Sequence, residues 1–217
     1  MSNNHNQPWK DLKAVIFDYG EVLCHRPTAE ETDRLASFFG LRADQLPALW
    51  ERNRGPYDRG DLEPDAYWSM LAKDAGVTLH REQLKAIHDL DMAMWSKVNS
   101  SMVQWMAQLH SSGIKLGLLS NMHPEMVAHC RQQFPWIKNF DFVTFSGEVR
   151  LIKPDRAIYE HTLRGLGVKA SEALFLDDRE VNIRAAHALG IHALRFESTE
   201  QLRRELKSAG FPILPEA

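Results

Sequence analysis

The chain has 217 residues, with 26 lysines and arginines against 29 aspartates and glutamates, and a formal net charge of −3. This length fits one large domain or a domain with an insertion, and without a basic stripe to displace counterions no nucleic-acid partner is expected. No apolar run approaches the ~18 residues that span a bilayer, residues 1–10 are polar, and the two cysteines are too few for a disulfide framework, so we expect a cytoplasmic protein with no membrane partner.

Short apolar runs, each ended by polar residues, predict buried strands. They cover residues 14–17, 116–119, 142–145, 173–176 and 191–194. Apolar runs of this length without polar alternation are typical of strands that are buried on both faces of a parallel sheet.

Helical patterns separate the later strands. One apolar stripe follows Pro124 and a second follows Pro154, since proline suits the first position of a helix. A third stripe consists of Val181, Ala185 and Leu189. Strands that alternate with helices predict an α/β fold, with a parallel sheet covered by helices on both faces.

Residues 26–97 differ from the rest because only helical patterns lie between the first and second predicted strands. Turn-forming residues at 54–61 predict a break between these helices. A helical run of about 70 residues is too long for one crossover connection. The sequence therefore predicts a core of residues 1–25 and 98–217 and a helical subdomain of residues 26–97. The alternative is that these helices cover one face of the sheet.

Polar residues follow three of the predicted strands where each strand ends. Asp18 follows the first strand, Ser120 and Asn121 follow the second, and Asp177 and Asp178 follow the fourth. In an open parallel sheet, ligands bind beyond the carboxyl ends of the strands. Carboxylates gathered there repel one another unless a cation lies between them. Oxygen ligands without His or Cys at metal-binding spacing favour Mg²⁺.

Lys153 follows the third strand, directly before the proline that is expected to start a helix. Its ammonium group could bring a second positive charge to the same edge. Each candidate also has an ordinary explanation when taken alone: Asp18 could form a turn, and the other strand-end residues could cap helices. Their occurrence together, in this order, favours a common site.

Four motifs together resemble those of the haloacid dehalogenase-like hydrolase superfamily. They are Phe17-Asp18-Tyr19-Gly20-Glu21-Val22-Leu23, Leu119-Ser120-Asn121, Ile152-Lys153-Pro154-Asp155 and Phe175-Leu176-Asp177-Asp178-Arg179-Glu180-Val181-Asn182. Residues 57–62 are also similar to a cap segment of the subgroup that includes small sugar-phosphate phosphatases. The resemblance covers nearly the whole chain. It implies a Rossmann-like core, a helical cap between the first two motifs, and a Mg²⁺-dependent mechanism through a phospho-aspartyl intermediate.

The resemblance implies a metal site around the nucleophile. Asp18 is the expected nucleophile, and Mg²⁺ is expected between Asp18, the Gly20 carbonyl and Asp178. Asp177 is expected behind these ligands, where it supports the waters of the metal. The arrangement makes physical sense because a carboxylate is a weak nucleophile that a phosphate dianion repels, and a cation neutralises both.

The resemblance also implies a phosphate site beside the metal. Ser120, Asn121 and Lys153 are the expected phosphate-binding residues, and Ser120 and Lys153 are also expected to be catalytic. The Ser120 hydroxyl and nearby main-chain N–H groups would hold the phosphate at the start of a helix. Asn182 is expected to orient Lys153 or the metal-site loop.

Gly20 departs from the phosphatase pattern. Phosphatases of the family usually carry a second aspartate there, two residues after the nucleophile, as general acid and base. Dehalogenases of the family also lack this carboxylate, but their first motif differs from the one in this chain. A glycine at this position resembles a subgroup that acts on sugar phosphates. Glu21, His25, a cap residue and water stay open as proton donors, as does His123, for which helix N-capping is expected.

These features favour a Mg²⁺-dependent phosphomonoester hydrolase that acts on a small phosphorylated metabolite, with a sugar phosphate as one candidate. One alternative is a 2-haloacid dehalogenase with Asp18 as its nucleophile, and a second is a catalytically impaired binding or regulatory protein. A monomer or a homodimer is expected. Specificity is expected from four residues of the helical subdomain, Arg52, Arg54, Tyr57 and Arg59.

Overall fold

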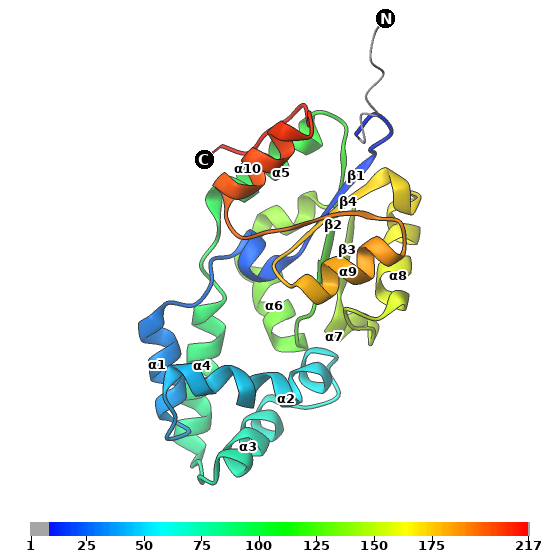
Figure 1. Cartoon of the computed structure of the whole chain (residues 1–217). Coiled ribbons are helices and arrows are strands. Elements are labelled where there is room, and N and C mark those ends of the chain that lie inside the picture. The colour runs from blue at the N-terminus through cyan, green and yellow to red at the C-terminus, as the bar shows by residue number, and fades with distance from the viewer. Residues whose placement is uncertain (1–8, 217) are drawn as a thin grey trace, which may run out of the picture.

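A computed structural model describes residues 9–216 (Figure 1). Five strands form one parallel sheet with the order β3-β2-β1-β4-β5. The strands are β1 (Ala14–Phe17), β2 (Lys115–Ser120), β3 (Phe142–Phe145), β4 (Ala173–Asp177) and β5 (His192–Arg195). Each agrees within one residue at either end with a predicted apolar run, so the predicted parallel sheet is confirmed.

Helices and turns join the strands. An irregular turn over Tyr19–Leu23 follows β1. The α-helices are α1 (Ala29–Ser37), α2 (Leu46–Asp58), α3 (Pro64–Ala75), α4 (Arg81–Met94), α5 (Ser100–Ser111), α6 (Pro124–Gln133), α7 (Ser146–Val149), α8 (Arg156–Leu166), α9 (Glu180–Ala188) and α10 (Thr199–Ser208). None of these helices within residues 9–216 could cross a membrane.

Helices cover both faces of the sheet. Because successive side chains of a strand point to opposite faces, Val15 and Phe17 of β1 pack in one apolar cluster and Ala14 and Ile16 in another. The first cluster includes α5, α6 and α10, and the second includes α8 and α9 (Figure 1). The predicted α/β layers are therefore confirmed.

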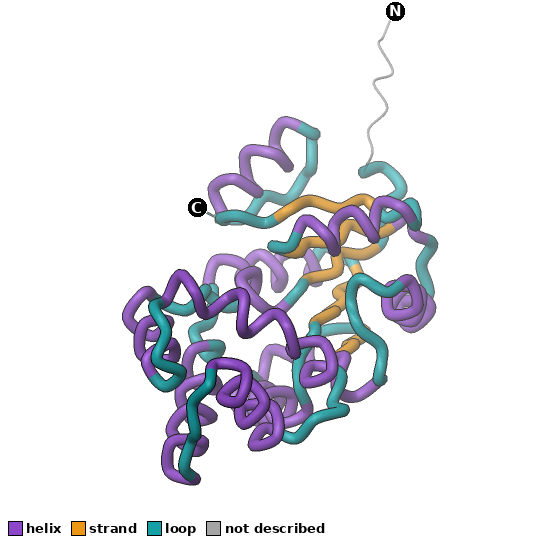
Figure 2. Tube along the Cα trace, turned by 60° about the horizontal axis from the view of Figure 1, so that its bottom comes forward, coloured by secondary structure: helices purple, strands orange, loops and turns teal. Residues whose placement is uncertain are grey.

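Helices α1 to α4 form the insertion between β1 and β2. They have an apolar cluster of their own, built around Tyr57, Tyr67 and Trp68, instead of covering a face of the sheet. In Figure 2 these helices gather at one end of the orange strands. The chain enters and leaves this helical insertion side by side, where Cys24 and Val98 form an antiparallel bridge.

Three local expectations differ in detail from the structure. The helix break expected within residues 54–61 falls at Gly60, which has φ +78°, because helix α2 continues through Pro56 to Asp58. Helix α8 begins at Arg156 and not at Pro154, because the Asp155 N–H donates to the Ile152 carbonyl (2.9 Å) and closes a turn there.

The third concerns the buried face of α9. Val181, predicted to lie in its apolar stripe, is 42% exposed, whereas Asn182, Ile183 and Ala186 are buried. A polar side chain, Asn182, therefore takes a place on the inner face. Its partners lie in the site described next.

Candidate active site

The strands β1 and β4 lie where the strand order reverses. From β1 the chain builds β2 and β3 on one side of the sheet and then β4 and β5 on the other. Phe17 pairs with Leu176, so that the residues that follow them, Asp18 and Asp177, leave neighbouring strands at the same edge. The Asp18 N–H donates to the Leu176 carbonyl (2.9 Å) and continues the ladder by one bond. Such reversal points are the usual ligand sites of open α/β sheets.

The three aspartates predicted at this edge do meet. Carboxylate oxygens of Asp18, Asp177 and Asp178 lie within 4.8 Å of one another. Burial, together with the charges of Asp177 and Asp178, raises the pKa of Asp18 to about 7 although Lys153 opposes the shift. Burial and Asp177 likewise raise the pKa of Asp178 to about 6. Close carboxylate oxygens that repel one another are a donor set that fits a hard divalent cation such as Mg²⁺.

Lys153 is the buried counter-charge of these aspartates. Its Nζ lies 2.9 Å from Asp18 Oδ1 and 2.6 Å from Asp177 Oδ2. Burial lowers the pKa of Lys153, but the charges of Asp177 and Asp18 outweigh burial and raise it. Asn121 fixes the main chain of Lys153, because its side chain accepts from the Lys153 N–H (2.9 Å) and donates to the Lys153 carbonyl (3.0 Å).

Asp177 is held from several directions. Asn182 Nδ2 donates to its Oδ1 and Oδ2 at 2.9 and 3.0 Å, and the Arg179 N–H donates to Oδ1 at 2.8 Å. With Lys153 on Oδ2, both oxygens of this fully buried carboxylate have partners. Asn182 therefore contacts Asp177 directly and is linked to Lys153 through the Asp177 carboxylate.

A cavity of about 290 Å³ lies between the strand ends and the helical insertion. From the core, its lining includes all the predicted site residues except Asp177, namely Asp18, Gly20, Ser120, Asn121, Lys153, Asp178 and Asn182. The Ser120 hydroxyl has no hydrogen-bond partner within the described part of the chain. The volume lies near the lower end for ligand pockets, which fits a small ligand.

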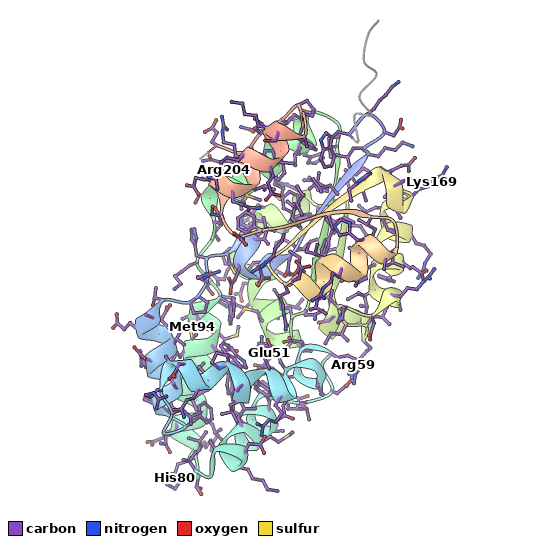
Figure 3. The ribbon with its side chains drawn as sticks, viewed as in Figure 1. Glu51, Arg59, His80, Met94, Lys169 and Arg204 are labelled. Atoms are coloured by element: carbon purple, nitrogen blue, oxygen red, sulfur yellow. The ribbon has the colours of Figure 1, made fainter. Side chains whose placement is uncertain are left out.

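The insertion supplies the other wall of the cavity. Its lining residues are Pro47, Trp50, Glu51, Arg54, Asp58 and Trp95. Arg54 Nε donates to Asp58 Oδ1 (2.8 Å), and the guanidinium lies over the Trp50 ring at 5.4 Å. Glu51 lies between the insertion and the core in Figure 3 and binds Arg179 Nη2 through both oxygens, each at 2.9 Å. An ion pair therefore bridges the two parts of the molecule beside the cavity.

Of the four residues expected to set specificity, only Arg54 lines the cavity. Arg52 and Arg59 contact Asp74 and Asp61 at the surface of the insertion. Tyr57 is fully buried, with its ring stacked on the Tyr67 ring at 4.1 Å. The reason is the helical phase of α2, because residues 50, 54 and 58 share the face that is turned to the cavity.

The histidines that the sequence offered as proton donors lie elsewhere. His25 is exposed and is not part of the cavity wall, although its N–H donates to the Lys97 carbonyl. His123 precedes α6, but its side chain does not cap the helix. Instead it is buried, stacked on the Tyr57 ring at 4.3 Å and 3.7 Å from Asp91 Oδ2. The expected capping role of His123 was therefore wrong.

Sequence reasoning missed Trp50, Glu51, Asp58 and Trp95 as cavity residues. Only Asp58 had a usable signal, since its spacing of four from Arg54 predicts an ion pair on a continuous helix. That signal was hidden by the turn-forming residues at 54–61, where a helix break was expected.

Comparison with known proteins agrees with this geometry. A model of the haloacid dehalogenase-like hydrolases matches residues 12–190. A sesquiterpene phosphatase of Aspergillus oryzae is 26% identical over 197 residues, 90% of this chain and 95% of that protein. The (S)-2-haloacid dehalogenase 4A of Burkholderia cepacia is 24% identical over 194 residues, 85% of this chain and 82% of that protein. Drimenol cyclase of Aspergillus calidoustus is 26% identical over 205 residues, 90% of this chain but only 36% of that protein.

Among solved structures, a HAD family enzyme of Bacteroides thetaiotaomicron, in complex with magnesium and inorganic phosphate, has the same fold. The TM-score is 0.67 at 18% identity, over 86% of this chain and 94% of that one. The family model spans most of the chain, from just before β1 to just after α9, and includes every strand end that contributes to the cavity. This chain therefore belongs to the haloacid dehalogenase-like hydrolases.

Proposed function

We propose that this hydrolase cleaves phosphomonoesters, with Asp18 as the nucleophile and Mg²⁺ as the cofactor. The observation that carries the proposal is the Asp18 carboxylate, which ends β1 inside a cavity, beside two further aspartates and one buried lysine. The phosphatase relative and the structural neighbour with magnesium and phosphate support this reading.

Asp18, the Gly20 carbonyl and Asp178 would hold Mg²⁺, because all three residues line the cavity. The bound cation would neutralise the carboxylates and the phosphate oxygens. The oxygens of Asp177 already accept from Lys153, Asn182 and Arg179. Asp177 would therefore support the waters of the metal instead of binding Mg²⁺ directly.

Lys153 and Ser120 would bind the transferring phosphoryl group. The Lys153 ammonium contacts Asp18 at 2.9 Å, so it can also reach an oxygen of a phosphate bound to that carboxylate. The Ser120 hydroxyl and the main-chain N–H of Asn121 would donate to the other oxygens. The Asn121 side chain acts on the Lys153 main chain, so its contribution to phosphate binding comes from the backbone.

Residues 26–97 would act as a cap over this site. Helix α2 places Trp50, Arg54 and Asp58 in the cavity wall opposite the strand ends. A cap in this position excludes water while the phosphoryl group is transferred. The substrate is then a small phosphorylated metabolite, and a cytoplasmic monomer or homodimer stays the expected form.

The dehalogenase relative makes 2-haloacid hydrolysis the second candidate. Its substrate carries a carboxylate, which the charges of Asp177 and Asp178 disfavour unless a cation is bound. Phosphomonoester hydrolysis, with phosphoryl transfer to Asp18, is therefore the first candidate function.

A release assay with two arms tests the proposal. Phosphate release from a panel of sugar phosphates, nucleotides and other phosphomonoesters should need Mg²⁺, fall to background in chelator and return when Mg²⁺ is added. Chloride release from 2-chloropropionate should be absent. Metal-independent chloride release without phosphate release would establish the dehalogenase instead.

A further inference from the structure

The proposed reaction lacks an evident proton donor. When a phosphomonoester is cleaved, the leaving oxygen of an alkyl group is a strong base and needs a proton. Because residue 20 is glycine, there is no carboxyl group two residues after the nucleophile. Beyond the three clustered aspartates, the described cavity wall contains the carboxyl groups of Glu21, Glu51 and Asp58.

Two of these carboxyl groups are already engaged by arginines. Glu21 Oε2 accepts from Arg26 at 2.7 Å, beside solvent. Glu51 is 62% exposed, and both of its oxygens accept from Arg179. Glu51 therefore has no free carboxyl oxygen, and Glu21, whose Oε1 has no partner within the described residues, is 26% exposed and so is not shielded from water.

Asp58 is placed differently. Its side chain is only 7% exposed, and its Oδ1 accepts from Arg54 Nε at 2.8 Å. Its Oδ2 has no hydrogen-bond partner within residues 9–216, yet it is not among the side-chain atoms that are cut off from solvent. The Asp58 carbonyl accepts from the Ser146 hydroxyl (2.6 Å), which fixes this end of α2 to the core.

The surroundings of Asp58 favour its protonated form. Burial raises its pKa above the ordinary range of an aspartate, against the opposing effect of Arg54. The other charged or titratable groups that face it include Tyr67 on α3, His123 ahead of α6 and Asp91 on α4. A buried carboxyl group whose pKa is raised keeps its proton to a higher pH than an exposed aspartate does, which favours a role as general acid.

We propose that Asp58 is the general acid and base of the reaction, supplied by the helical insertion in place of the carboxyl group that is absent at Gly20. This proposal rests on the phosphatase function proposed above. In the first step Asp18 attacks phosphorus, the bond from phosphorus to the leaving oxygen breaks, and the Asp58 proton passes to that oxygen to give the alcohol. In the second step water attacks phosphorus, its proton passes to the Asp58 carboxylate, and the bond from phosphorus to Asp18 breaks to release phosphate.

This assignment ties proton transfer to the position of the insertion. Asp58 belongs to α2, whereas Asp18 belongs to the core, so both line one cavity only when the insertion covers the strand ends. Acid catalysis and exclusion of water are then provided together.

The test compares two leaving groups in Asp58→Asn, which keeps an oxygen to accept from Arg54. The rate of the first step, measured as release of the alcohol or of 4-nitrophenolate within a single turnover, should fall by about 10²–10⁴-fold for an alkyl phosphate but only a few-fold for 4-nitrophenyl phosphate, because 4-nitrophenolate leaves without a proton. Asp89→Asn is the matched control, since Asp89 forms an i,i+4 ion pair with Lys85 on the same insertion, away from the cavity. It should leave both rates unchanged.

Gly20→Asp in the Asp58→Asn background provides a rescue. A Cβ at Gly20 meets nothing nearer than Trp95 Cζ3 at 3.9 Å, so the new carboxyl group has room to restore alkyl phosphate turnover. In the wild type, alkyl phosphate turnover should also fall at alkaline pH while 4-nitrophenyl phosphate turnover persists, which tests the proposal even if the variant does not fold.

Equal losses in the first-step rate on both substrates, or no loss on either, would overturn the assignment to Asp58 while leaving the phosphatase function intact. So would identical alkaline limbs for the two substrates in the wild type. A wild type that releases phosphate from no phosphomonoester would overturn the phosphatase function itself.

Discussion

Asp18 faces two opposing requirements at the end of β1. A nucleophile has to be ionised, whereas burial beside Asp177 and Asp178 raises its pKa to about 7. Lys153, 2.9 Å away, offsets part of this cost. A metal-free site is therefore unfavourable to its own nucleophile at neutral pH, and a bound cation removes the conflict.

Asp18→Asn should abolish turnover while preserving the fold. The amide keeps the size and most of the hydrogen-bonding capacity of the carboxylate but does not attack phosphorus. Phosphate release should fall to background, and beryllofluoride, a phosphoryl mimic, should bind the wild type but not the variant. Retention of most of the activity would exclude the covalent route through Asp18.

The same variant should show how Asp18 affects stability. The pKa of Asp18 rises from 3.8 to about 7 in the folded state, so the folded protein binds this proton more tightly than the unfolded chain. Its favourable contribution is complete below pH 4 and is lost as the pH rises to about 7, on the order of 1–4 kcal/mol.

Urea unfolding in chelator checks this expectation at pH 5 and pH 8. The stability of Asp18→Asn relative to the wild type should increase between these two values, because asparagine does not titrate. A difference that stays constant with pH would contradict it.

Among individual residues, the sequence predicted the site residues at the strand ends but, of those on the insertion, only Arg54. Asp18, Ser120 and Asp178 are brought together by strand pairing, which short apolar runs encode locally. Trp50 and Asp58 reach the cavity only because the insertion packs over the sheet edge, a long-range contact that no local pattern encodes.

Among the elements, α8 approaches β3 unusually closely at Gly165. A Cβ built on Gly165 would lie 2.3 Å from ring carbons of Phe142. Only a residue without a side chain fits this approach between the helix and the strand.

Gly165→Ala should therefore destabilise the protein by about 1–3 kcal/mol despite the higher helix propensity of alanine. Urea unfolding of a double-mutant cycle with Phe142→Leu provides the measurement. Because the ring is the obstacle, the alanine should cost less in the Phe142→Leu background. An equal cost in both backgrounds would show that the ring is not responsible.

The elements also show where periodicity reaches its limit. The strands agree with their apolar runs because both faces of the sheet are buried, but the inner face of α9 was assigned to Val181 and not to Asn182. Apolar character locates a buried face only where the neighbours are apolar. At the site the neighbour is Asp177, for which an amide is the better partner.

Across the whole molecule, one hydroxyl group connects the insertion to the loop after β2. Ser146 Oγ accepts from the Met122 N–H (2.8 Å) and donates to the Asp58 carbonyl (2.6 Å), and the residue is fully buried. This shared contact joins the end of α2 to the core, as the ion pair of Glu51 and Arg179 does at another point of the helix.

Ser146→Ala should destabilise the protein by about 1–3 kcal/mol, because it leaves buried main-chain groups without partners. Ser37→Ala is the matched control: its hydroxyl donates to the Arg34 carbonyl at the surface, so its effect should stay within about 0.5 kcal/mol. Chemical denaturation measures both. Similar small effects of the two substitutions would show that the buried contact is dispensable.

The bridge between Cys24 and Val98 has an evolutionary consequence. On either side of it, the His25 N–H donates to the Lys97 carbonyl (2.7 Å) and the Asn99 N–H to the Leu23 carbonyl (2.9 Å), so the two connecting segments are already paired. Paired Cα atoms in such a bridge are about 5 Å apart, a gap that a tight turn closes. The paired junction therefore lets the insertion be lengthened or exchanged without shifting any strand, but a replacement that changes selectivity has to bring its own proton donor in place of Asp58.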